Sequence, residues 1–220
     1  MNRFFSMDNK FFTFMNRVAD LIILNLLFLV CSLPVVTIGA SATALYYVTL
    51  KMVRNEDSYM FRSFLKAFKE NFKQSTLIWI VMLLMGLLLY ADFKIIDIIP
   101  GTLISVVRYL LMVITFLYAM VLLFIFPLQS KFENTIRNTF KNALLMSIRH
   151  LPYTLLMLVI SVIPMGATLT IPVVFLYGLL VWILLGFSLT AFINSRFFVK
   201  IFDKYIPADE EEEELPAMPE

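Results

Sequence analysis

The side chains that most often carry out catalysis or bind metal ions are scarce in this chain. It holds one histidine, His150, and one cysteine, Cys31. These two residues cannot assemble a histidine-rich or cysteine-rich metal site, and they allow no disulfide bond within the chain. The sequence contains no phosphate-binding glycine loop, no G-x-S-x-G and no H-E-x-x-H motif. We therefore predict no catalytic residues, no metal site and no cofactor, and we expect a protein that is not an enzyme.

Three polar residues within apolar runs are the remaining candidates for chemistry, namely Asp20, Asn25 and Arg108. Ionisable groups at such depth often mark the path of an ion or a substrate. However, helical rise would place Asp20 and Arg108 near opposite faces of a membrane, roughly 15 Å or more apart. We expect each to reach its own surface, or Arg108 to pair with Asp92 or Asp97. Asn25 is expected to hydrogen-bond across helices, and a transport role for the three residues is the alternative.

The amino-acid composition indicates the class of protein to which this chain belongs. Hydrophobic residues make up 60% of the 220 residues and charged residues only 15%, and the mean hydropathy is +0.85. A soluble domain carries about 25% charged residues, so a water-soluble, a disordered and a disulfide-stabilised protein are all excluded. The apolar runs do not alternate with polar residues as the strands of an outer-membrane barrel would. The sequence predicts an all-α, polytopic transmembrane helical bundle.

Six stretches are long enough to span the hydrocarbon core as helices. They are residues 18–33, 34–52, 76–91, 102–128, 153–170 and 172–194. The second stretch is the least apolar, so five spans with a re-entrant or interfacial helix at 34–52 remain the alternative. We expect one transmembrane domain over residues 1–206. The tail 207–220 contains six consecutive acidic residues at 209–214, and such a run predicts a solvated, disordered end.

The placement of the positive charges predicts the orientation. All but Lys94 and Arg108 of the 18 Lys and Arg residues fall in four segments: 1–17, 51–73, 129–150 and 195–220. Positive residues accumulate on the cytoplasmic side of a membrane, and six spans would place all four segments on one side. We therefore predict that the N- and C-termini both lie in the cytoplasm.

Two of these segments have the pattern of amphipathic cytoplasmic connecting helices. In the first, helical spacing places the aromatic residues on one face, namely Phe61, Phe64, Phe68 and Phe72. The cations fall on another face, namely Arg62, Lys66, Lys69 and Lys73. In the second, Arg137 and Lys141 are displaced from an apolar face. Such helices lie at the membrane interface and attract anionic headgroups. They predict a docking face for anionic lipid or for a cytoplasmic partner, and simple anchoring of the bundle is the alternative.

The central block of the chain resembles a known family. The runs SLPVVTIGASATALYYVTLKMVRNED, FRSFLKAFKENFKQST and LLMGLLLYAD, together with LNLLFLVCSLP and NSRFFVKIFDKY, are similar to the YesL-type family of uncharacterised bacterial membrane proteins. The resemblance extends to about Tyr205 and leaves out the acidic tail. It implies a plasma-membrane protein with no established activity and no known catalytic residues. Members are often associated with genes for carbohydrate uptake and breakdown.

These observations favour a non-catalytic accessory or scaffold protein linked to carbohydrate uptake. The expected partners are the lipid bilayer, anionic lipid and a carbohydrate transporter complex, with no nucleic acid; the sequence does not determine the oligomeric state. A membrane subunit of a sugar transporter is one alternative, although residues 141–152 lack the Glu-Ala-Ala start of an ATPase-docking loop. A small carrier or channel is another, and it would need Asp20, Asn25 and Arg108 to line a polar path.

Overall fold

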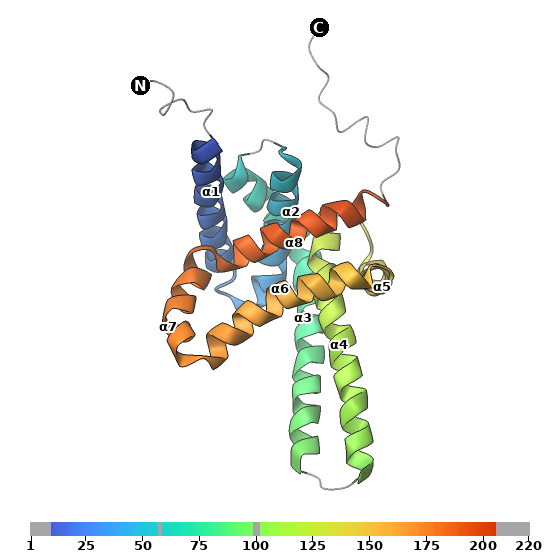
Figure 1. The fold of residues 1–220 in the computed structure, drawn as a ribbon. Helices are drawn as coiled ribbons and strands as arrows, with labels where there is room; N and C mark the ends of the chain where they lie inside the picture. The colour runs from blue at the N-terminus through green and yellow to red at the C-terminus, as the bar shows by residue number, and fades with distance from the viewer. Residues whose placement is uncertain (1–9, 57–58, 99–101, 206–220) are drawn as a thin grey trace, which may run out of the picture.

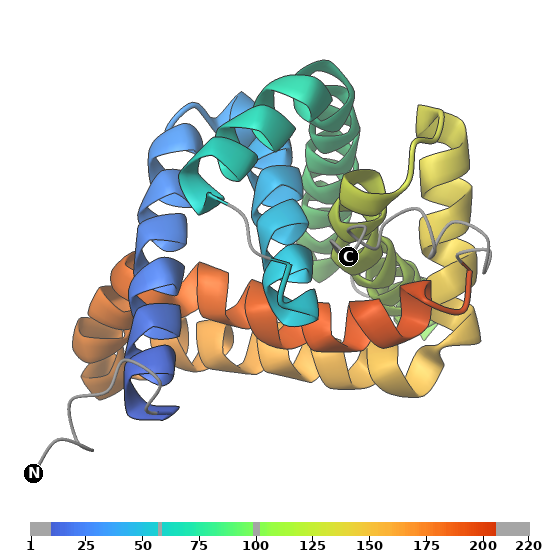
Figure 2. The ribbon, with the colours of Figure 1, turned by 90° about the horizontal axis from the view of Figure 1, so that it is seen from above.

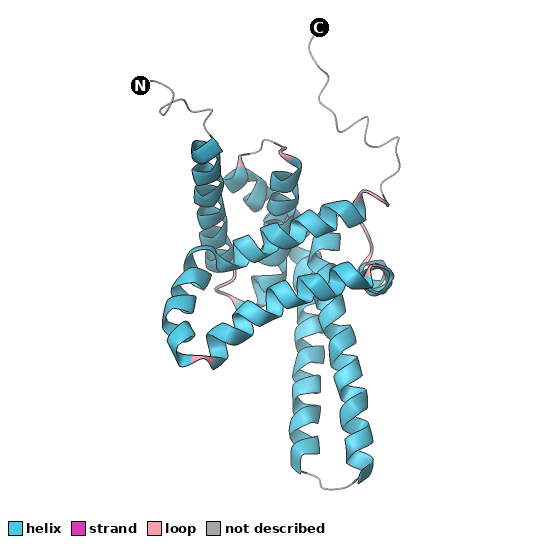
Figure 3. Cartoon of the chain, in the orientation of Figure 1, coloured by secondary structure: helices cyan, strands magenta, loops and turns pink. Residues whose placement is uncertain are grey.

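The computed structural model describes residues 10–56, 59–98 and 102–205. This part of the chain is helical almost throughout, with short connections and no strand (Figure 3). The elements are α1 (Lys10–Cys31), the 3-10 turn η1 (Val35–Thr37), α2 (Ile38–Arg54), α3 (Met60–Ile98), α4 (Thr102–Lys131), α5 (Ile136–Arg149), α6 (Leu151–Thr170), α7 (Pro172–Val181), the π-helical turn η2 (Trp182–Gly186) and α8 (Phe187–Phe202). The predicted acidic tail lies outside the described residues.

Six helices in the described residues are long and apolar enough to cross a membrane, which confirms the predicted fold class. They are Phe11–Cys31, Val35–Arg54, Met60–Ile98, Ile104–Lys131, Leu151–Thr170 and Pro172–Phe202. The last of these runs through α7, η2 and α8 without a break. The second is the least apolar of the six and the most deeply buried within the protein. It therefore packs mainly against other helices.

The helix α2 lies at the centre of the packing because its residues are small. Ala40, Ser41 and Ala44 are fully buried, and small side chains let neighbouring helices approach closely. The closest approach is at Gly39, where an added Cβ would overlap the carbonyl oxygen of Ser75 on α3. The side chains of α2 contribute to two apolar clusters. One cluster joins α2 to α1, α3 and α8, and the other joins it to α3, α4, α5, α6 and α8.

The amphipathic segment 60–73 is not a separate connecting helix. It forms the first turns of α3, a single helix of 39 residues that continues through the predicted span 76–91. No glycine or proline lies between residues 60 and 76 to end the helix, so the two predicted elements merge. By contrast, α5 is a helix of its own. Thr135 caps its N-terminus by accepting a hydrogen bond from the backbone N–H of Asn138.

The helices α3 and α4 form a long hairpin that projects away from the rest of the protein (Figure 1). The helices α6 and α8 run across the direction of this hairpin in both views (Figures 1 and 2), so the six apolar helices do not share one axis. The outer half of the hairpin exposes large apolar side chains, including Leu88 at 65% and Leu110 at 59%. Exposed apolar surface of this extent requires an apolar environment or a partner.

Candidate functional site

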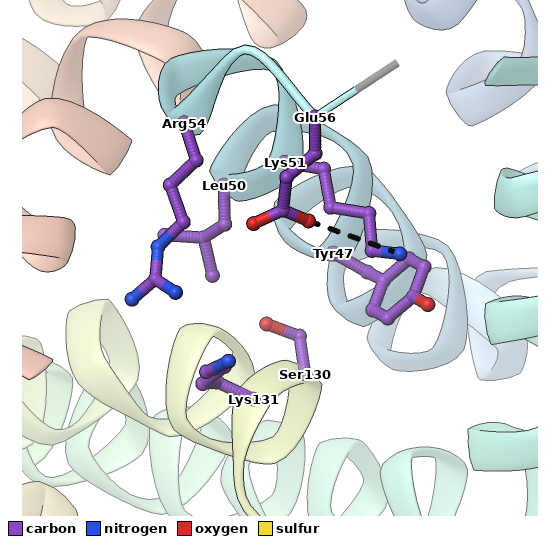
Figure 4. A pocket seen from close by; sticks show the side chains of 7 residues that line it. All are labelled: Tyr47, Leu50, Lys51, Arg54, Glu56, Ser130 and Lys131. Atoms are coloured by element: carbon purple, nitrogen blue, oxygen red, sulfur yellow. Dashed lines mark ion pairs between the residues drawn. The ribbon is translucent and has the colours of Figure 1, made fainter. Parts of the chain in front are cut away.

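A polar pocket of about 350 Å³ opens between the C-terminal ends of α2 and α4 (Figure 4). Its lining residues come from α2, from the turn after it and from α4: Tyr47, Leu50, Lys51, Arg54, Glu56, Ser130 and Lys131. Figure 4 shows Arg54, Ser130 and Lys131 around one common space. The sequence alone did not single out this cluster of cations, because its members come from two helices separated by the whole of α3.

Carboxylates and helix ends offset much of the positive charge of this pocket. The Nζ of Lys51 lies 3.9 Å from a carboxylate oxygen of Glu56, and Arg54 pairs with Asp203 just after α8. Lys51 and Arg54 lie in the last turn of α2, and Lys131 lies in the last turn of α4. The C-terminal end of a helix carries a partial negative charge that favours cations. The arrangement therefore ties the ends of α2, α4 and α8 together and leaves only a weak attraction for a free anion.

The structure divides the predicted docking face on α3 between the interior and the surface. Phe64 is fully buried and Phe68 is half-buried against the same cluster, which includes residues of α1 and α2. The apolar ends of the face remain outside, with Phe61 55% and Phe72 38% exposed. The four predicted cations are all exposed: Arg62, Lys66, Lys69 and Lys73. What the segment presents outward is thus mainly positive charge, with one aromatic ring near each end.

The second predicted segment forms α5 and presents the same kind of surface. Arg137 and Lys141 are both exposed and lie one helical turn apart. The opposite side of α5 is anchored through Thr139, whose hydroxyl donates a hydrogen bond to the Oε1 of Gln129 on α4. Gln129 is itself buried and also accepts a hydrogen bond of 3.1 Å from the Nε2 of Gln74 on α3. This network, which the sequence did not indicate, fixes α5 against α3 and α4.

The two ionisable residues within apolar runs do not meet. The guanidinium of Arg108 donates a hydrogen bond to Oδ1 of Asp97, at 3.0 Å across the tip of the α3–α4 hairpin. Asp97 is one of the two partners that the sequence allowed for Arg108. Asp20 instead lines a small polar pocket with Arg17 and Asn55, at the end of α2. Arg108 and Asp20 belong to separate local groups, so they form no shared polar path.

Asn25 is fully buried, and its side chain binds backbone rather than another side chain. Its Nδ2 donates hydrogen bonds to the carbonyl oxygens of Trp182 (3.0 Å) and Ile183 (2.7 Å). Its Oδ1 accepts a hydrogen bond from the backbone N–H of Ser188 at 3.0 Å. These partners lie in or just after the π-helical turn η2. Asn25 therefore joins α1 to the π-helical turn η2 and to the start of α8.

A second cavity, lined mainly by aromatic and aliphatic side chains and called the aromatic cavity here, lies between the apolar helices. It has a volume of about 360 Å³ and lies among α1, α2, α3, α4, α6 and α8. Aromatic rings make up much of its wall, including Trp79, Phe126 and Trp182, and none of its lining residues carries a charge. Its few polar groups include the hydroxyls of Tyr46 and Ser161. Such a lining can accept an apolar group but offers few hydrogen bonds to a sugar.

His150, the single histidine, lies between α5 and α6 and contacts Tyr205, the third residue after α8. Its Nε2 and the hydroxyl of Tyr205 are 3.0 Å apart in a hydrogen bond. Burial, together with the positive charges of Lys204 and Arg149, lowers the pKa of His150 below its usual value. The described residues contain no group of three His, Cys, Asp or Glu side chains placed to hold a metal ion. The histidine thus connects two helix ends.

Comparison with known proteins relates this architecture to a family. Residues 21–93, which run from α1 through α2 into α3, match the family model described as "Protein of unknown function, DUF624". The chain is also 30% identical over 155 residues to "Uncharacterized protein YteU" of Bacillus subtilis (strain 168), across 70% of this chain and 69% of the relative. No solved structure matches the chain significantly. The resemblance to an uncharacterised family is thereby confirmed, while the YesL-type designation stays a prediction. With this relative and this family model together, the chain belongs to the DUF624 family of proteins of unknown function.

Proposed function

We propose that this chain is an integral protein of the bacterial plasma membrane with both termini in the cytoplasm. The exposed apolar surface of the α3–α4 hairpin supports membrane residence. The charge distribution supports the orientation, because only Lys94 and Arg108 among the Lys and Arg residues lie outside the four predicted cytoplasmic segments. Reporter fusions test this orientation. A reporter active only in the cytoplasm is expected to work after Lys131 and to fail after Ile98. The opposite pattern contradicts the proposal.

Within the membrane, the protein acts as a non-catalytic accessory or scaffold for carbohydrate uptake. The observation that carries this proposal is a set of exposed cations on two helices, Lys66, Lys69 and Lys73 on α3 and Arg137 and Lys141 on α5. One of them, Lys66, pairs with Glu70 at 3.9 Å. Hydrogen bonds from Gln74 on α3 and Thr139 on α5 to Gln129 join both helices to α4, so each helix presents its cations on a preformed surface for an acidic partner. The link to carbohydrate uptake comes from the resemblance of the sequence to the YesL-type family.

Affinity capture from the native membrane tests the scaffold role. The tagged full chain, extracted in a mild detergent, is expected to retain a subunit of a carbohydrate transporter. The charge reversal Lys69→Glu should reduce that recovery because Lys69 lies on the exposed face of the first turns of α3. The matched control is Lys94→Glu, an exposed lysine near the other end of the same helix, and it should leave recovery unchanged. Equal recovery with both variants contradicts the proposed docking face.

The composition of the aromatic cavity favours this role over that of a carrier. A sugar or an ion crossing the bundle would need polar groups along its path, and the cavity lined by Trp79, Phe126 and Trp182 has no charged residue. Reconstitution separates the two roles. Liposomes that contain only this chain are expected to show no sugar flux. Flux that appears only when an ATPase is added would instead indicate a subunit of a sugar transporter.

A further inference from the structure

A groove of about 920 Å³, distinct from the polar pocket of Figure 4, separates α1 from α8. Its walls are apolar over most of their length, with Val18 and Leu21 contributed by α1 and Leu185, Leu189 and Phe192 contributed by η2 and α8. Three cations also line it, namely Arg17, Arg196 and Lys200. The groove thus combines a long apolar surface with a concentrated positive charge.

The cations come from the two walls that border the C-terminal end of α2. On α1, Arg17 reaches the end of α2 by donating hydrogen bonds of 2.9 Å to the carbonyl oxygen of Met52 and to Oδ1 of Asn55. On α8, Lys200 lies about one turn before Asp203, which pairs with Arg54 at the same end of α2. Both helices therefore place their cations beside the C-terminal end of α2.

The apolar walls extend away from this charged end. The residues that line α8 run back from Lys200 to Leu185, a length of roughly 22 Å at 1.5 Å per residue. Half of a hydrocarbon core is about 15 Å thick, so the groove is long enough for an acyl chain of one leaflet. A polar end with an apolar length of this size has the shape of a phospholipid lying along the protein.

The charge at the polar end is not neutralised within the groove. The acceptors of Arg17 are a backbone carbonyl and an amide oxygen, both of them neutral. The guanidinium of Arg196 lies over the ring of Phe192, 5.1 Å from its centre, and Lys200 is exposed. The nearest carboxylate on α1 is Asp20, which lines the neighbouring polar pocket rather than the groove. Asp20 attracts Arg17 from that pocket, but no carboxylate is among the described residues that line the groove.

We propose that this groove binds one anionic phospholipid, with its phosphate held by the cations Arg17, Arg196 and Lys200 and an acyl chain along the apolar wall of α8. The positive end selects for net negative headgroups, because a zwitterionic lipid gains the apolar contacts but little of the electrostatic attraction. The same end should lie at the cytoplasmic interface. This binding site is independent of the scaffold role, since it involves none of the cations of the docking face.

Native mass spectrometry of the purified full chain tests the proposal. Titration with dioleoylphosphatidylglycerol should give one preferred adduct, and dioleoylphosphatidylcholine should bind about tenfold more weakly. The double variant Arg196→Gln/Lys200→Gln should lower the affinity for phosphatidylglycerol about tenfold without altering that for phosphatidylcholine. The control is Lys94→Gln/Arg108→Gln, which removes a Lys and an Arg from exposed positions of the α3–α4 hairpin, outside the docking face. It should change neither affinity.

Three results would overturn the proposal. An equal loss of phosphatidylglycerol in both double variants would mean that net charge alone attracts the lipid. Displacement of the adduct by millimolar inorganic phosphate would mean a site for free phosphate, because phosphate cannot compete for the acyl-chain contacts. Unchanged phosphatidylglycerol binding in the Arg196→Gln/Lys200→Gln variant would show that the lipid binds elsewhere and that the groove has another ligand. Because Arg196 and Lys200 are both exposed, the variant should fold, and its melting temperature provides the check.

Discussion

The side chain of Asn25 on α1 and the backbone of Ser188 on α8 are joined by a hydrogen bond of 3.0 Å, although 163 positions separate them in the chain. Ser188 is the second residue after the π-helical turn η2. The hydrogen bonds of a π-helical turn reach one residue further than those of an α-helix, so backbone groups at the transition lose their usual partner. Asn25 supplies that partner, and it also holds the carbonyl oxygens of Trp182 and Ile183.

The substitution Asn25→Leu should therefore destabilise the protein. It leaves one buried N–H and two carbonyl oxygens without this partner, at a cost of about 1–2 kcal/mol. Each kcal/mol corresponds to about 2–4 °C in melting temperature for a chain of this length, which a thermal melt in detergent can resolve. The matched control is Asn16→Leu, an exposed position on the same helix. A melt unchanged by Asn25→Leu would contradict the role assigned to Asn25.

The close packing of α2 against α3 predicts that a substitution at Gly39 also lowers the stability of the protein. A Cβ added there would overlap the Ser75 carbonyl oxygen and lie 2.5 Å from the Cβ of Trp79. Because these are backbone and near-backbone atoms, they cannot rotate away, and Gly39→Ala should cost about 2 kcal/mol or more. At Gly166, by contrast, a Cβ meets no atom within 4 Å. Gly166→Ala should be neutral or stabilise by up to about 1 kcal/mol, and thermal melts of the two variants should differ clearly.

The ion pair at the tip of the hairpin should contribute little to stability or function. The side chains of Asp97 and Arg108 are 64% and 45% exposed, and exposed ion pairs contribute about 0–1 kcal/mol. The double variant Asp97→Asn/Arg108→Gln should thus keep its melting temperature within about 3 °C. It should also leave sugar uptake by the native cells unchanged. A loss of uptake with intact folding would revive a transport role for Arg108.

The lowered pKa of His150 predicts a dependence of stability on pH. Above the pKa of the unfolded chain, about 6.5, the histidine is neutral in both states and imposes no penalty. As the pH falls through this value, the unfolded chain binds a proton first, so the folded state loses stability until the folded pKa is passed. The melting temperature should decline from pH 7 to pH 5, and His150→Gln should reduce the slope. Tyr205→Phe keeps the titrating group and should preserve the pH dependence, although it removes the hydrogen bond.

Much of the fold follows from local properties of the sequence. The lengths and apolar character of the runs predicted six membrane-spanning helices, and the described residues contain six helices of that kind. The amphipathic connecting helix predicted before the third span is continuous with that span, because the boundary between an amphipathic segment and an apolar one need not be a break in a helix. With no glycine or proline at the junction, backbone hydrogen bonding continues from Met60 to Ile98.

The candidate sites were less predictable because they depend on contacts between distant segments. Helical spacing placed Phe64 on an aromatic face, but only its packing against α1 and α2 shows that it is buried. The cations Arg17, Arg196 and Lys200 lie in segments that the sequence marked only as basic. Their gathering beside the end of α2 depends on how α1 and α8 pack there.

The amino-acid sequence by itself thus predicted a helical protein of membrane-like apolarity and six long apolar helices. It also showed that the cations are concentrated in four segments. Hydropathy, length and charge are properties of each segment, so they can be read without knowing where the segment lies. The tertiary structure alone decided the partner of Asn25, the close approach at Gly39 and the groove between α1 and α8. These depend on how helices cross one another, which is set by many weak packing contacts between residues far apart in the chain.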